Sequence, residues 1–94
     1  MQLQTGALSC LVTDPDGDPL PGVTVDAQLS GDPPQVRTTN ATGYAIFETL
    51  MPGTYEVKAE LAGYSDGWYP DVRVAMGRKT DLPITLQPAV GGGA

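Results

Sequence analysis

Apolar and polar residues alternate along most of the chain, in short runs that end at glycine and proline. In the clearest run, residues 54–61 (TYEVKAEL), the apolar side consists of Tyr55, Val57, Ala59 and Leu61. Successive side chains of a strand point to opposite faces, so a period of two is typical of a strand with one buried face. The run therefore predicts a half-buried β-strand.

The same alternation predicts six further strands. A short one is expected around Val36 to Thr39. The inward rows of the other five are Leu8, Cys10 and Val12; Val23, Val25, Ala27 and Leu29; Ala45 and Phe47, closing on Leu50; Val72 and Val74; and Leu82, Ile84 and Leu86. Turn-forming segments such as DPDGDPLPG, NATG and AGYSDG separate the runs. Seven short strands at this spacing predict an all-β fold, a seven-stranded antiparallel Greek-key β-sandwich.

Length and composition fit one small domain. The 94 residues include nine prolines and twelve glycines, which leave little room for long helices. We expect a single domain over residues 1–88, followed by a glycine-rich tail over residues 89–94. The single cysteine, Cys10, excludes an internal disulfide.

The charge balance excludes several partners. The net charge is –6, the chain has no histidine, and its five basic residues form no run. A surface that binds phosphates needs clustered lysine and arginine, so we expect no nucleic-acid partner. No stretch approaches the roughly 20 apolar residues of a membrane span, so we expect no membrane insertion.

Two motifs carry a family resemblance. Residues 14–23 read DPDGDPLPGV, and residues 43–55 read GYAIFETLMPGTY, which is G-x-x-x-F-x-x-L-x-P-G-x-Y. Together with their flanks they resemble the carboxypeptidase regulatory-like domain, a small transthyretin-like, Ig-like β-sandwich, over most of residues 6–86. Cys10 replaces a glycine that is usual in that family, and Ala45 replaces a common aromatic. Both changes bear on core packing and leave the fold prediction intact.

The resemblance implies an accessory domain without catalysis, attached to enzymes, receptors, adhesins or surface assemblies. A related transthyretin-like group hydrolyses a purine-derived substrate at a site that depends on histidines, which this chain lacks. Cys10 lies on an inward row, so we interpret it as a core residue and not a nucleophile. We therefore predict no enzymatic activity, no catalytic residues and no cofactor.

An acidic segment raises the question of calcium. Asp14, Asp16 and Asp18 match the first three ligand positions of an EF-hand loop. Pro19 and Val25 then occupy the positions of the required glycine and of the bidentate glutamate. We predict a tight turn and no metal site, although the sequence leaves weak calcium binding open.

An aromatic segment offers candidate partner-binding residues. Trp68, Tyr69 and Tyr64 lie in GYSDGWYPDV (residues 63–72), whose glycine, serine and aspartate content predicts a loop. Exposed aromatic rings in a loop would stack on a sugar or anchor a protein contact. The sequence leaves open whether Trp68 instead folds back and caps one end of the sandwich.

These features favour a non-enzymatic structural or interaction module. We expect it to attach to or decorate a larger surface assembly (a virion capsid or tail, a filament or a cell-surface protein) through loops and sheet edges. Its partner would be another protein or its own copies. The alternative is a glycan-binding accessory module that uses the Trp68/Tyr69 loop. We expect a virion or extracellular surface location, although residues after Met1 show no signal-peptide pattern.

Overall fold

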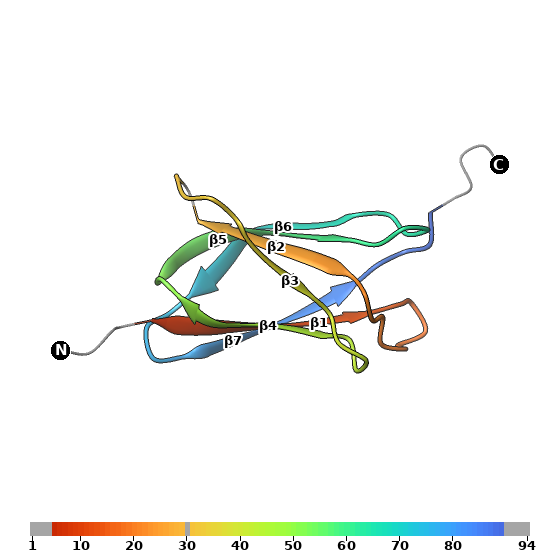
Figure 1. Cartoon of the computed structure of the whole chain (residues 1–94), viewed down its shortest axis with the longest axis horizontal. Helices are drawn as coiled ribbons and strands as arrows, with labels where there is room; N and C mark the ends of the chain where they lie inside the picture. Colours follow the sequence, from red (N-terminus) through yellow and green to blue (C-terminus); the bar gives the residue numbers. More distant parts are fainter. Residues whose placement is uncertain (1–4, 30, 90–94) are drawn as a thin grey trace.

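The computed structural model describes residues 5–29 and 31–89, and these form two β-sheets packed face to face (Figure 1). The seven strands are β1 (Gly6–Thr13), β2 (Thr24–Leu29), β3 (Gln35–Thr38), β4 (Tyr44–Leu50), β5 (Gly53–Glu60), β6 (Gly67–Val74) and β7 (Lys79–Thr85). The prediction of a seven-stranded all-β sandwich is confirmed. Of the predicted tail, all but Ala89 lies outside the described residues.

The strand order defines the two layers. Sheet A has the order β4-β1-β7, and sheet B has the order β3-β2-β5-β6. Four of the strand pairs are antiparallel, as predicted. The exception is β1 with β7, a parallel pair that runs from Ala7 opposite Lys79 to Thr13 opposite Thr85. The chain leaves sheet B after β6 and enters sheet A beside its first strand, in the same direction as that strand.

The core lies between the sheets and consists of the predicted inward rows. Phe47, Leu8 and Ile84 are fully buried, and most other members of these rows are also buried. Leu29, Leu61 and Leu82 are partly buried and pack against this core. The period-two reading therefore placed each row on the correct face, because a register error of one residue would have turned a whole row outward.

Two contacts close the sandwich where the chain crosses between sheets. Thr39 is buried, and its hydroxyl donates to the carbonyl of Leu20 at 2.7 Å and accepts the N–H of Val23 at 2.8 Å. The buried hydroxyl is thus fully hydrogen-bonded. The guanidinium of Arg37 on β3 lies 5.3 Å from the ring centroid of Phe47 on β4, a cation–π contact that covers the core at this side.

The prediction of a loop over residues 63–72 is wrong for its second half, because β6 begins at Gly67. β6 carries one residue more than β5 between the pairs Tyr69–Val57 and Val72–Tyr55, which makes a β-bulge. Pro70 lies in this bulge. An edge strand and a bulge are the places where a sheet tolerates proline, so its presence did not prevent pairing.

The register of β4 is testable with two neighbouring positions. Phe47→Ala removes a fully buried ring and should lower the free energy of unfolding by about 3–5 kcal/mol. The matched variant Ile46→Ala, at a side chain that is 45% exposed, should cost under about 1 kcal/mol. Urea denaturation measures both. Equal losses would show that the strand does not turn Phe47 inward and Ile46 outward.

Candidate interaction site

The acidic segment folds as a tight turn, which confirms that interpretation. One carboxylate oxygen of Asp14, Oδ1, accepts the backbone N–H groups of Asp16 and Asp18, both at 2.9 Å. The N–H of Gly17 donates to the carbonyl of Asp14 at 3.0 Å, and Gly17 has φ +90°, which favours glycine. Within residues 5–29 and 31–89 no three acidic or cysteine side chains gather as a metal site. The absence of calcium binding stays a prediction.

The three candidate aromatic residues do not form one surface. Trp68 lies on β6 opposite Lys58, faces away from the core and is 59% exposed. Tyr69 is next along the strand, so it points to the opposite face, where it packs against the core. Tyr64 is also partly buried against the core. The structure therefore does not support capping by Trp68, and Trp68 and Tyr69 do not share an exposed platform.

Tyr69 is held by side-chain packing, and the turn that contains Tyr64 is held by backbone hydrogen bonds. A Cβ built on Gly67 would lie 3.5 Å from Cε1 of Tyr69 and 3.1 Å from Cδ2 of Leu86, so Gly67 leaves room for both side chains. The turn around Tyr64 is bonded to the segment after β7. There the N–H of Ser65 donates to the carbonyl of Gln87 at 2.8 Å, and the N–H of Ala89 donates to that of Gly63 at 3.0 Å.

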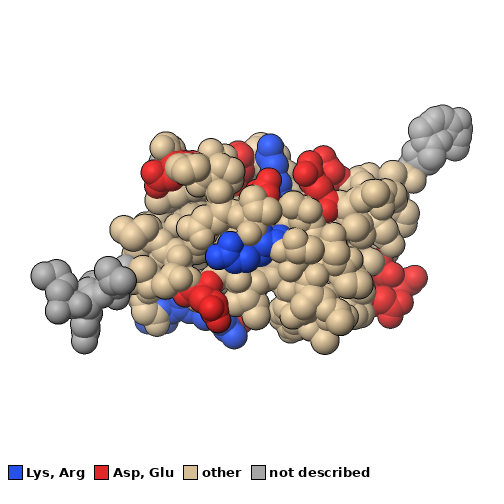
Figure 2. Space-filling view, in the orientation of Figure 1, with Lys and Arg blue, Asp and Glu red and all other residues tan. Residues whose placement is uncertain are grey.

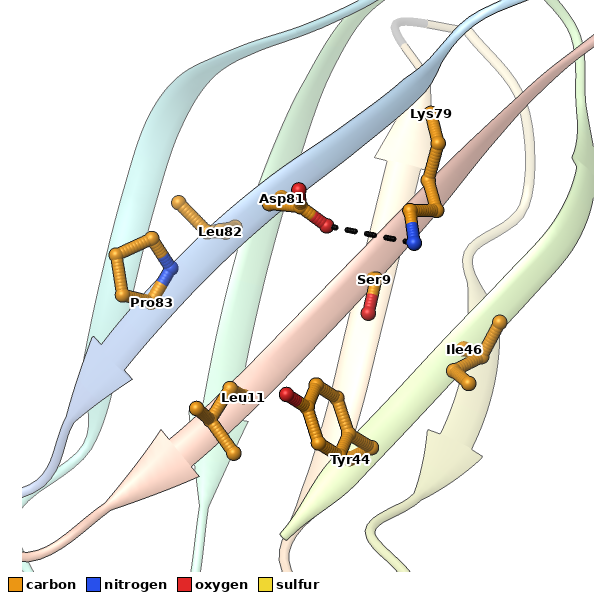
Figure 3. Close-up of a pocket in the computed structure, with 8 residues that line it drawn as sticks. All are labelled: Ser9, Leu11, Tyr44, Ile46, Lys79, Asp81, Leu82 and Pro83. Atoms are coloured by element: carbon orange, nitrogen blue, oxygen red, sulfur yellow. Dashed lines mark ion pairs between the residues drawn. The ribbon is translucent and has the colours of Figure 1, made fainter.

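The outer face of sheet A carries an apolar surface that the alternation pattern did not predict (Figure 3). Two cross-strand rows form it, namely Ile46, Ser9 and Asp81, and Tyr44, Leu11 and Pro83. With Lys79 and Leu82 they line an open groove of about 570 Å³, which we call the sheet A groove. Its signal was present in the sequence, because Leu11 and Ile46 occupy the polar side of otherwise alternating strands.

The groove is exposed at its margins and buried at its centre. Tyr44 and Ile46 are 39% and 45% exposed, whereas Ser9 between the strands is only 6% exposed. Such burial on an outer face shows that the neighbouring side chains already cover the middle strand. Figure 3 shows these side chains spread over the three strands without an enclosing wall. A small-molecule site normally encloses most of its ligand, so this geometry suits a flat protein surface better.

The charges at the groove are few and balanced. The ammonium Nζ of Lys79 lies 3.9 Å from Oδ1 of Asp81, and both side chains are mostly exposed, so the pair adds little stability. On the face of the molecule in Figure 2, charged side chains of both signs stand among a larger uncharged surface. No helix of the described residues is long and apolar enough to cross a membrane.

The two packed sheets, the tight acidic turn and the open outer face define the class of the domain as a small β-sandwich module. A protein-family comparison agrees, since the model of the carboxypeptidase regulatory-like domain matches residues 7–87. The chain belongs to this family, as its motifs indicated. A search of curated protein sequences found no match.

Similar solved structures show the same fold. The TIE protein of Bacillus anthracis matches with a TM-score of 0.76 and 23% identity, over 92% of this chain and 17% of that protein. A minor pilin of Streptococcus agalactiae matches with a TM-score of 0.74 and 21% identity, over 92% of this chain and 45% of the pilin. The chain thus spans less than half of either protein.

A third structure of the same fold is an enzyme. The 5-hydroxyisourate hydrolase of Klebsiella pneumoniae matches with a TM-score of 0.67 and 24% identity, over 93% of this chain and 89% of the hydrolase. Identities of this size establish the fold and leave activity to be argued from the residues themselves.

The opposite orientations of Trp68 and Tyr69 give a stability test. Trp68→Ala should change the free energy of unfolding by less than about 1 kcal/mol, because most of the ring is already in water. Tyr69→Ala should cost about 2 kcal/mol or more, because it removes a ring packed on the core. Chemical denaturation measures both variants. A larger loss for Trp68→Ala would mean that its ring caps the sandwich after all.

Proposed function

We propose that this domain is a non-catalytic structural module of a cell-surface assembly and that its sheet A groove contacts another protein. The observation that carries the proposal is the pair of exposed apolar side chains, Tyr44 and Ile46, beside a middle strand whose outward Ser9 is nearly buried and whose outward Leu11 is partly buried. A contiguous apolar patch rimmed by polar groups is typical of a protein contact. The similarity to a minor pilin supports a surface setting. A virion setting has no such support among these comparisons.

A second copy of the domain is the occupant that we propose for the groove. Lys79 and Asp81 lie side by side on β7 at its rim, one positive and one negative. In a two-fold contact the same patch meets itself, so the Lys79 of each copy can face the Asp81 of the other. Because the chain carries a net charge of –6, copies repel one another over most of their surface. A patch whose positive and negative charges balance does not contribute to that repulsion.

The area of the patch sets the expected strength. Three strands spaced about 4.8 Å apart and about seven residues long span roughly 300 Å². A stable complex buries about 800 Å² on each partner, so isolated copies should associate weakly. Many copies held in one assembly would compensate, because linked weak contacts act together.

Catalysis is not part of the proposal, despite the similar hydrolase. The chain contains no histidine to act as a base, and its one thiol, Cys10, is fully buried. Burial raises the pKa of that thiol to about 12, so it stays protonated at neutral pH. The hydroxyl of Ser9 is nearly buried on the outer face and has no histidine to activate it.

Glycan binding remains the second candidate because Trp68 is exposed on sheet B. The site would now consist of that ring alone, since Tyr69 faces the core. Trp68 is the only tryptophan of the chain, so its fluorescence reports directly on any sugar stacked against it. A saturable fluorescence change on adding a glycan, together with loss of the calorimetric binding heat in Trp68→Ala, would favour this candidate over the protein contact.

Weak self-association through the groove is testable by NMR. A dilution series should show concentration-dependent shifts at Tyr44, Ile46 and Leu11. Ile46→Asp should abolish them, because it replaces an apolar side chain of the contact by a charged one. The matched control Thr54→Asp adds the same charge at an exposed position of sheet B and should leave them unchanged. Spectra independent of concentration, or shifts confined to the surroundings of Trp68, would contradict the proposed contact.

A further inference from the structure

The parallel pairing of β1 and β7 joins the first strand of the domain to its last. Seven residue pairs connect them, from Ala7 opposite Lys79 to Thr13 opposite Thr85. Two further hydrogen bonds bracket this ladder. The N–H of Ala7 donates to the carbonyl of Arg78 at 2.9 Å, and the N–H of Leu86 donates to that of Thr13 at 3.0 Å. The ladder thus extends over the whole length of sheet A.

The chain enters and leaves the sandwich at opposite ends (Figure 1). At one end the carbonyl of Thr5 accepts the N–H of Gly77 in the turn between β6 and β7, at 2.9 Å. At the other end Ala89 is bonded to Gly63, in the turn between β5 and β6. These two turns lie at opposite ends of β6. A force applied to the two ends of the chain therefore acts parallel to the strands.

We propose that the domain is a tension-bearing link in its assembly and that the β1–β7 ladder is the element that resists the load. A pull on the start of β1 and on the end of β7 slides two parallel strands past each other. All the hydrogen bonds of the ladder are then loaded together and must break nearly at once. If the same strands were pulled apart from one end, the bonds would break one after another at a lower force.

Packing reinforces the ladder on both faces. The inward side chains of β1, Leu8, Cys10 and Val12, are fully buried, as is Ile84 on β7. Ser9 is nearly buried on the outer face. Sliding β1 past β7 therefore drags apolar side chains out of a close-packed core, which opposes the same motion as the hydrogen bonds. This role goes beyond the proposed protein contact and does not require it.

The segment after β7 should yield before the ladder. Within the segment that the structure describes, up to Ala89, two backbone hydrogen bonds tie it to the β5–β6 turn: the N–H of Ser65 donates to the carbonyl of Gln87, and the N–H of Ala89 donates to that of Gly63. A pull on the end of the chain reaches these bonds first. We expect a small early extension, followed by cooperative rupture at a higher force when the ladder fails.

Single-molecule pulling in two geometries tests the proposal on the unaltered core. In the first, marker domains are attached at both ends of the full chain, so that β1 and β7 are sheared. In the second, the handles are the chain's start and a cysteine introduced at the exposed Arg78 (Arg78→Cys), so that the same strands are pulled apart from one end. Cys10 does not compete for the handle, because it is fully buried. We expect a rupture force several times higher in the first geometry.

Variants of the ladder separate its hydrogen bonds from other effects. The carbonyl of Arg78 and the N–H of Leu86 point to β1. Because every second residue of a paired strand turns its backbone groups to the same neighbour, the N–H of Thr80 also points to β1. Thr80→Pro removes such an N–H and should lower the end-to-end rupture force. Asp81→Pro controls for the proline itself, since the N–H of residue 81 points to the free edge. Thr80→Val controls for the lost bond from the Thr80 hydroxyl to the carbonyl of Arg73.

The two pulling geometries and the ladder variants each have an outcome that supports or overturns the load-bearing role. Higher force in the shearing geometry, lost in Thr80→Pro and kept in both controls, supports the load-bearing role. Equal forces in the two geometries would overturn it, even if Thr80→Pro fails to fold. A Thr80→Pro variant that folds and ruptures at the original force would also overturn it. None of these readouts depends on self-association, so the proposed contact stands or fails separately.

Discussion

Strand β1 is the constraint on which the other features of this sandwich depend. It is hydrogen-bonded on both sides, to β4 and to β7, and it is the only strand of sheet A with two neighbours. Its inward residues form part of the core, and its outward Ser9 is also nearly buried. A short strand held on four sides in this way fixes the register of sheet A, and through the shared core it fixes how sheet B packs.

The proposed contact and the load path both follow from this position. Because β1 carries Leu11 on its outward face, the outer side of sheet A places Leu11 between Tyr44 and Pro83 and offers an apolar patch to a partner. Because β1 pairs in parallel with the last strand, the chain passes through the domain from end to end. A module built like this can both contact a neighbour sideways and transmit force along its length.

Most of the fold, and little of the site, could be predicted from the sequence. Alternation placed Leu8, Phe47 and Val57 inward because one buried face imposes a period of two. It could not reveal that β7 pairs in parallel with β1, since pairing partners are set by the packed tertiary structure. The glycine, serine and aspartate content of residues 63–67 disguised the start of β6, and so Trp68 was expected in a loop. The sheet A groove was missed because Leu11 and Ile46 were read singly, before their strands were known to be neighbours.

Native-state hydrogen exchange tests the central place of β1 most directly. Locally stable regions exchange only when the whole domain unfolds, whereas weakly held ones open earlier. The amides from Leu8 to Thr13 should therefore exchange with the free energy of global unfolding, together with the amides of β5 in sheet B. Exchange of the β1 amides at a clearly lower free energy than those of β5 would show that sheet A opens by itself, and it would contradict the role assigned to β1.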